Sequence, residues 1–191
     1  MDVTREEVAK RLSFDLNVFH KRLNTGDDWQ VVIQGHLFLD HILSCTLVEA
    51  LEYPDKIQLD RMTFSMKLDL SAAMGLLGPL EAGLRRINRL RNSIAHDLDF
   101  IVTDQHGKDI RDLGPEVVRE LVDEQLSEKG GSVLRHAIKV SAVVLDINRQ
   151  RLAERRALEA ARVAKLQAAM ENARRVLVEL DLERSVTSIE K

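Results

Sequence analysis

The chain has 191 residues, of which 45% are hydrophobic, 4% aromatic and 31% charged, with one cysteine and three prolines. This length and apolar content allow a buried core and argue against a disordered chain. Few aromatic residues, beside abundant Leu, Ala, Arg and Glu, disfavour an all-β sandwich or barrel and favour helices. The single Cys45 excludes an internal disulfide, and without paired cysteines the sequence has no zinc-finger pattern.

The ends of the chain differ in charge and in patterning. The N-terminal segment MDVTREEVAKRL is charged and amphipathic, unlike a secretory signal with an apolar core, so we expect a cytoplasmic protein. The net charge of −3 is unevenly distributed, because residues 149–191 contain ten Lys and Arg against seven Asp and Glu. Residues 1–148 therefore carry about −6.

Hydrophobic spacing predicts a succession of helices in chain order. Residues 29–51 are apolar on nearly every side, which predicts a central buried helix. Polar residues such as Asp40 interrupt this run, and an aspartate in mid-membrane costs about 2.5–3.5 kcal/mol, so we do not expect a transmembrane span. Before this run, steps of three and four residues predict a helix whose apolar face is formed by Val8, Leu12, Leu16, Phe19 and Leu23.

The middle of the chain predicts four further segments. Gly78 and Pro79 separate one helix from a second that runs from about Leu80 to Asp97. Residues 99–113, DFIVTDQHGKDIRDL, begin with alternating apolar and polar residues, which favours a short hairpin or an ordered loop. Gly114 and Pro115 then open a helix that ends near Lys129. The helix before Gly78 has a predicted apolar stripe formed by Leu59, Met62, Met66, Leu70, Ala73 and Leu77.

The C-terminal part predicts one long helix. Nothing breaks a helix from Ser132 to about Glu183, and a continuous rod of this length would span roughly 75 Å. We therefore divide the chain into a helical domain, residues 1–148, and a helical extension, residues 149–191. A coiled-coil contact with a second copy and a helix folded back on its own domain both remain open for the extension. Its predicted seam is formed by Val163, Leu166, Met170, Ala173, Leu177 and Leu180.

The helix at residues 80–97 has two contrasting faces on a helical wheel. Its apolar stripe is formed by Leu84, Ile87, Leu90, Ile94 and Leu98. Arg91 projects near the edge of that stripe, about 140° from His96 at 100° per residue. The aliphatic part of an arginine side chain at this position is partly buried, so its guanidinium group needs polar partners. The opposite face is polar and cationic, with Arg85, Asn88, Arg89, Asn92 and His96.

The segment RNSIAH, from Arg91 to His96, places a polar residue directly after an arginine and a histidine five positions later. This spacing resembles the signature of the HEPN superfamily (higher eukaryotes and prokaryotes nucleotide-binding). Residues 28–100 also look like mannitol-repressor-family regulators and related HEPN-like proteins. The resemblance implies an all-α, HEPN-like antiparallel helical bundle, with a short hairpin or loop after the motif helix and a long C-terminal helix.

Many HEPN domains are metal-independent endoribonucleases in toxin and defence systems, so the resemblance implies that Arg91, Asn92 and His96 are catalytic. The chemistry suits them, because RNA supplies its own 2′-hydroxyl nucleophile. His96 can transfer the proton near neutral pH, and the Arg91 guanidinium can pair with phosphate oxygens. We expect the other polar residues of this helix, Arg85, Asn88 and Arg89, to bind nucleic acid, and we expect no metal or cofactor.

The resemblance also implies which partners and which alternative functions we expect. In HEPN proteins the active cleft lies between two domains, so we expect a homodimer that binds RNA, together with an antitoxin or regulatory protein, and no membrane. The alternative is a non-catalytic regulator resembling the mannitol-repressor family, in which the motif only bonds neighbouring helices; a third is a helical adaptor. His36, Asp40 and His41 are more readily explained as hydrogen-bonded polar residues of the core than as metal ligands, and Cys45 as packing.

Overall fold

The computed structural model describes the backbone of residues 11–187 and the side chains of residues 11–176. Within this part of the chain the structure is helical and has no strand, as the composition predicts. Short 3₁₀ helices, η1 (Pro54–Lys56), η2 (Leu59–Arg61) and η3 (Gly78–Leu80), join some of the α-helices. The α-helices are α2 (Leu16–Asn24), α3 (Asp28–Ala50), α4 (Phe64–Ala73), α5 (Glu81–His96), α6 (Asp104–Leu113), α7 (Glu116–Lys129) and α8 (Val133–Thr187).

The chain forms two units, Met1–Arg151 and Leu152–Lys191. The first unit contains α2 to α7 and the first turns of α8, and the second contains the rest of α8. The predicted long C-terminal helix is therefore present as α8, although its residues belong to both units.

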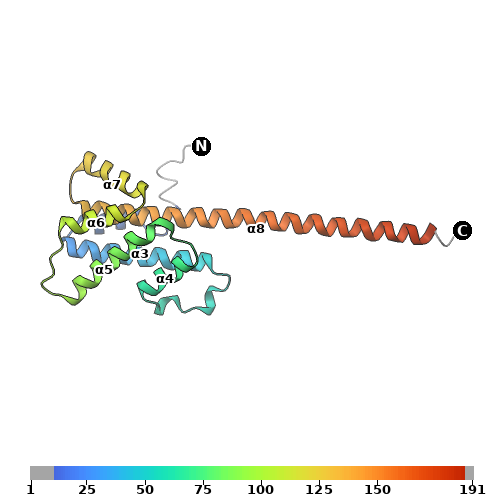
Figure 1. Cartoon of the computed structure of the whole chain (residues 1–191), viewed down its shortest axis with the longest axis horizontal. Helices are drawn as coiled ribbons and strands as arrows, with labels where there is room; N and C mark the ends of the chain where they lie inside the picture. Colours follow the sequence, from blue (N-terminus) through green and yellow to red (C-terminus); the bar gives the residue numbers. More distant parts are fainter. Residues whose placement is uncertain (1–10, 188–191) are drawn as a thin grey trace. The chain divides into compact units, whose positions relative to one another are not determined.

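Helix α3 organises the first unit, because it packs against α2, α4 and α5 (Figure 1). The apolar run that predicted a buried helix is confirmed, since α3 covers residues 28–50 and buries side chains on several sides. By length and composition alone α3 could cross a membrane, a test that a buried core helix also passes. In this structure α3 supplies Leu39, Ile42 and Leu43 to the core, each with no exposed surface.

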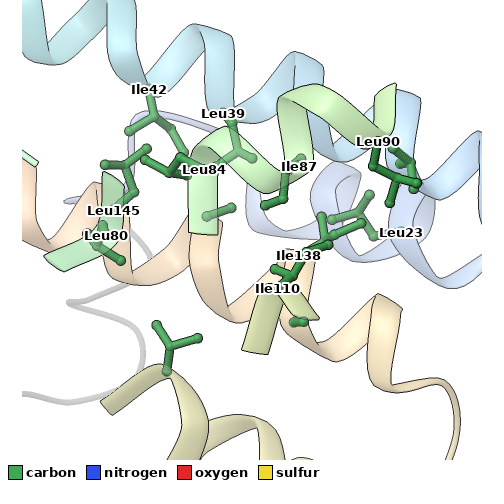
Figure 2. Packing of buried hydrophobic residues seen from close by; sticks show 14 of the residues in the cluster. Leu23, Leu39, Ile42, Leu80, Leu84, Ile87, Leu90, Ile110, Ile138 and Leu145 are labelled. Atoms are coloured by element: carbon green, nitrogen blue, oxygen red, sulfur yellow. The ribbon is translucent and has the colours of Figure 1, made fainter. Parts of the chain in front are cut away.

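The core brings together residues from helices far apart in sequence. Figure 2 shows Leu39 and Ile42 of α3 beside Leu84 and Ile87 of α5. Leu23 of α2, Ile110 of α6 and Ile138 of α8 belong to the same buried cluster. This packing holds α5 by its apolar side and leaves its polar side directed away from the core.

Two predicted apolar faces are wrong in detail, because capping residues shift where the helices begin. Asp15 caps α2 by accepting a hydrogen bond from the Val18 N–H at 2.9 Å, so this helix starts at Leu16. Leu12 lies outside α2, and Val8 lies outside the described residues. Phe19 and Leu23 of this face are buried as predicted.

Thr63 similarly caps α4, and its hydroxyl accepts from the Met66 N–H at 3.3 Å. The helix therefore begins at Phe64 and not at Leu59, which rotates the buried face. Met66, predicted to be buried, is 52% exposed. The buried positions are Phe64, Lys67, Leu68 and Ser71.

Of the hairpin or ordered loop expected in residues 99–113, the structure has a loop that ends at residue 103 and no hairpin. Residues 97–103 form the connection, and α6 starts at Asp104. A capping box explains this start, because His106 accepts from the Thr103 N–H at 3.0 Å. Leu98, assigned to the apolar stripe of the preceding helix, lies after the end of α5 and is fully exposed.

In the second unit, the side chains of the predicted seam are exposed where they are described. Val163 is 43% exposed, Leu166 56% and Met170 72%. The side chains of Leu177 and Leu180 lie outside the described residues. The coiled-coil contact remains a prediction.

Two glycines give a matched test of the packing between α6 and α8. A Cβ on Gly107 would lie 2.4 Å from the Leu134 backbone N, whereas a Cβ on Gly83 would meet nothing closer than the Ile110 carbonyl oxygen at 3.5 Å. We expect Gly107→Ala to lower the free energy of unfolding by about 1–3 kcal/mol through overpacking. Gly83→Ala, in α5, should raise it by up to about 1 kcal/mol through helix propensity. Urea titration followed by circular dichroism measures both, and equal effects of the two variants would contradict this packing.

Candidate nucleic-acid interface on helix α5

The two faces of α5 follow from its sequence. Leu84, Ile87 and Leu90 are at most 1% exposed and anchor the helix on the core. Ile94 is half-buried and packs against the edge of the same cluster. The remaining positions carry the amide, guanidinium and imidazole groups of the predicted site.

The motif residues lie in the last two turns of α5. The Arg91 side chain is half-buried, and its Nη1 donates to the Asn92 Oδ1 at 3.3 Å. Asn92 and His96 are exposed. His96 is the last residue of α5, where an imidazole can also interact favourably with the helix dipole.

The structure does not bring Arg91 and His96 into contact within one chain. Both side chains stand on one regular helix, so they are separated by about 140° around the axis and about 7.5 Å along it. Within the described residues, the hydrogen bond from Arg91 to Asn92 is the only one that joins two of the three predicted catalytic residues. In a single copy, the guanidinium expected to bind the phosphate and the imidazole expected to transfer the proton therefore lie apart.

The cations of α5 differ in how far internal carboxylates neutralise them. Arg85 pairs with Asp69 at 2.7 Å and with Glu81 at 2.8 Å, and Arg86 pairs with Asp109 at 2.8 Å. Arg89 is exposed and has no ion-pair partner among the described residues. Arg89 is thus more available to a phosphate than Arg85, a distinction that the sequence did not reveal.

Asn88 is engaged inside the molecule as well as lying on the polar face. Its Oδ1 accepts a hydrogen bond from the Nε2 of His36 in α3 at 3.2 Å. The His36 ring lies 4.2 Å from the Phe64 ring, centroid to centroid. Burial lowers the pKa of His36, the bond to Asn88 opposes this, and the positive charge of Arg91 adds to the lowering. His36 is therefore a hydrogen-bonded support behind α5.

The polar residues of α3 each have a partner of their own, as expected for His36, Asp40 and His41. Asp40 accepts from the buried Lys67 ammonium at 2.7 Å, and the exposed His41 bonds to the Ser13 carbonyl oxygen at 2.8 Å. Only His36 of the three is buried. Within the described residues, no group of three or more His, Cys, Asp or Glu side chains is arranged to hold a metal ion.

Apolar side chains without internal partners flank the motif. Leu98 is fully exposed and Ile101 is 77% exposed, and both lie in the connection that follows His96. Large apolar side chains exposed in one short segment are a feature that an interaction surface would cover. The polar end of α5 therefore adjoins a surface suited to a protein partner.

Comparison of the chain with protein-family models, with curated proteins and with solved structures found no match. The candidate interface accordingly stands on the geometry of α5 and on the RNSIAH spacing.

Proposed function

We propose that this protein is a metal-independent endoribonuclease of HEPN type, active as a homodimer whose cleft combines the motif helices of two copies. The observation that carries this proposal is the end of α5, where the Arg91–Asn92 pair and the exposed His96 adjoin the exposed Leu98 and Ile101. Two such helices facing each other across a twofold axis would place Arg91 of one copy near His96 of the other.

The proposed reaction needs only the RNA and these side chains. The 2′-hydroxyl attacks the adjacent phosphorus and gives its proton to the imidazole of one His96, while the bond from phosphorus to the 5′ oxygen breaks. The leaving 5′ oxygen then takes this proton back from the same imidazolium, and the product ends in a 2′,3′-cyclic phosphate. Arg91 would pair with the phosphorane oxygens as charge accumulates there.

Cleavage assays in EDTA test this proposal. Incubation of single-stranded and structured RNA with the full chain should give fragments that end in 2′,3′-cyclic phosphate at an undiminished rate. Loss of activity on chelation would contradict the metal-independent mechanism. Light scattering of the same sample should report about twice the 21.7 kDa mass of one chain.

The internal bonding of α5 favours a second candidate function. Asn88 is bonded to His36 and Arg85 is paired with Asp69 and Glu81, so part of the polar face supports the fold. In that case the protein is a non-catalytic regulator that acts through protein contacts made by Leu98 and Ile101. RNA that is neither bound nor cleaved, together with capture of an antitoxin-like or regulatory protein lost on Leu98→Ser, would favour this function.

The difference between Arg89 and Arg85 gives a prediction for RNA binding. Each phosphate contact releases counterions, so Arg89→Ala should reduce the slope of log affinity against log salt by about one. Arg85→Ala should change the slope less, because Asp69 and Glu81 already neutralise this guanidinium. Titration of a non-cleavable RNA analogue at several salt concentrations measures both slopes. An unchanged slope for Arg89→Ala would contradict nucleic-acid binding by this face.

A further inference from the structure

The first unit contains a cavity that has no part in the site on α5. It has a volume of about 450 Å³ and lies between α2, α7 and the first turns of α8. None of its lining residues comes from α5. Its size is within the range of about 300–1,000 Å³ typical of sites for small organic ligands.

One end of this cavity is apolar. Helix α8 contributes side chains spaced three and four residues apart, which share one face of the helix. Phe19 of α2 and Leu121 of α7 complete the apolar surface. The contributing residues of α8 are Val140, Val143, Val144 and Ile147.

The other end is polar and lies along the preceding turns of the same helix. Ser132, Arg135, His136 and Lys139 line the cavity there, and Lys129 joins them from the end of α7. Residues 132–139 and 140–147 each cover about 12 Å of a straight helix at 1.5 Å per residue. The cavity therefore changes from polar to apolar along its length.

The polar end has an excess of positive charge. It contains Lys129, Arg135 and Lys139, and no Asp or Glu lines the cavity. Arg135 pairs with Asp28 at 3.0 Å, whereas among the described residues the Lys129 and Lys139 ammonium groups bond to the neutral amide oxygens of Gln125 and Asn24. Burial, with the neighbouring charges of Arg135 and Lys129, lowers the pKa of Lys139. An anion placed here would offset this repulsion.

A buried hydroxyl at the same end has no partner. The Ser132 Oγ is shielded from solvent and makes no hydrogen bond within the described residues. It directly precedes the first residue of α8 and belongs to the cavity lining. Buried polar groups are nearly always hydrogen-bonded, so this end of the cavity has an unused donor.

We propose that this cavity binds a small amphipathic carboxylate, of which a straight-chain fatty acid is the simplest form. The carboxylate accepts from the Lys129 and Lys139 ammonium groups, and the alkyl chain lies against residues 140–147 of α8. This binding site is separate from the proposed ribonuclease site, and its test does not depend on RNA cleavage.

Calorimetric titration of the full chain with decanoate, below its micellar concentration, tests the proposal. Decanoate should bind saturably at one site per chain. Decan-1-ol and decyltrimethylammonium should bind at least about tenfold more weakly, because they lack the charge-assisted hydrogen bonds. No saturable decanoate binding, or equal binding of the alcohol and the carboxylate, would overturn the proposal.

Variants separate the two ends of the cavity. The double variant Lys129→Gln/Lys139→Gln should weaken decanoate binding at least about tenfold. Lys56→Gln/Lys108→Gln, which changes two exposed lysines elsewhere, should not weaken it. Val143→Trp should abolish binding by filling the apolar end, with Val163→Trp in the second unit as its control. Melting temperatures monitor folding, and the lysine variants keep the test decisive if Val143→Trp unfolds. Unchanged binding in a folded lysine double variant would overturn the proposal.

Discussion

Replacing His96 by alanine is expected to lower the rate of RNA cleavage by about 10²–10⁴-fold, the usual contribution of a positioned general acid or base. His96 is exposed at the end of α5 and supports no core packing, so the melting temperature should stay nearly unchanged. Single-turnover cleavage of a labelled RNA measures the rate, and differential scanning calorimetry measures stability.

Three further variants show whether this loss of cleavage comes from the proposed site. His41→Ala removes an exposed histidine of α3 and should cleave at the wild-type rate. Arg91→Ala should lose about 10²–10³-fold, while Arg91→Lys retains the charge without the planar fork and should recover only part of that loss. Arg91→Ala should also destabilise the fold slightly, because this side chain is half-buried. Normal cleavage by both His96→Ala and Arg91→Ala would make the motif structural.

Removing Asp146 should have the largest effect on stability. This residue of α8 has no exposed surface, and its carboxylate accepts from the Ser13 Oγ at 2.7 Å and from the Arg149 Nε at 2.8 Å. The Gln150 Nε2 adds a third side-chain donor at 3.1 Å. Asp146→Ala leaves the largely buried Arg149 without this partner, so we expect the free energy of unfolding to fall by about 3–5 kcal/mol. Glu171→Ala, which removes an exposed carboxylate of the same helix, should cost less than about 1 kcal/mol.

The pH dependence distinguishes charge from packing at this position. Burial alone would raise the pKa of Asp146, but hydrogen bonds from Arg149 and Ser13 hold it below the ordinary value of 3.8. As the pH falls, Asp146 therefore becomes protonated in the unfolded chain at a higher pH than in the folded protein. The stability that the ionised Asp146 contributes is present above pH 3.8 and is lost as the pH falls through the lower pKa of the folded state. The stability difference between wild type and Asp146→Asn should accordingly narrow from pH 5 to pH 3. A constant difference over this range would show that shape and not charge is responsible.

The sequence predicted helix bounds and buried faces well where the hydrophobic pattern lies within a single helix. The apolar run of α3 and the two-faced pattern of α5 need only the regular spacing of side chains on a helix, so their bounds were predicted closely. The half-buried position of Arg91 followed from the same wheel. The start of α6 was missed because its capping box uses His106, where glutamate or glutamine is the usual signal.

Contacts between distant segments were outside the reach of sequence patterns. The bond from His36 to Asn88 joins residues 52 positions apart, and the buried Lys67 pairs with Asp40, 27 positions away in the sequence. The neutralisation of Arg85 depends in the same way on Asp69, which belongs to another helix. The cavity beside α8 requires residues of three helices, none of which carries a recognisable motif alone.

The most direct test of a cleft shared by two copies is the cleavage rate of a mixed dimer. One copy carries Arg91→Ala and the other His96→Ala, and two different affinity tags allow the mixed dimer to be purified. If Arg91 of one copy acts with His96 of the other, one of the two sites is intact, and the rate in EDTA should be about half that of the wild-type dimer. A mixed dimer that cleaves no faster than either variant alone would contradict a shared site at the ends of the two α5 helices.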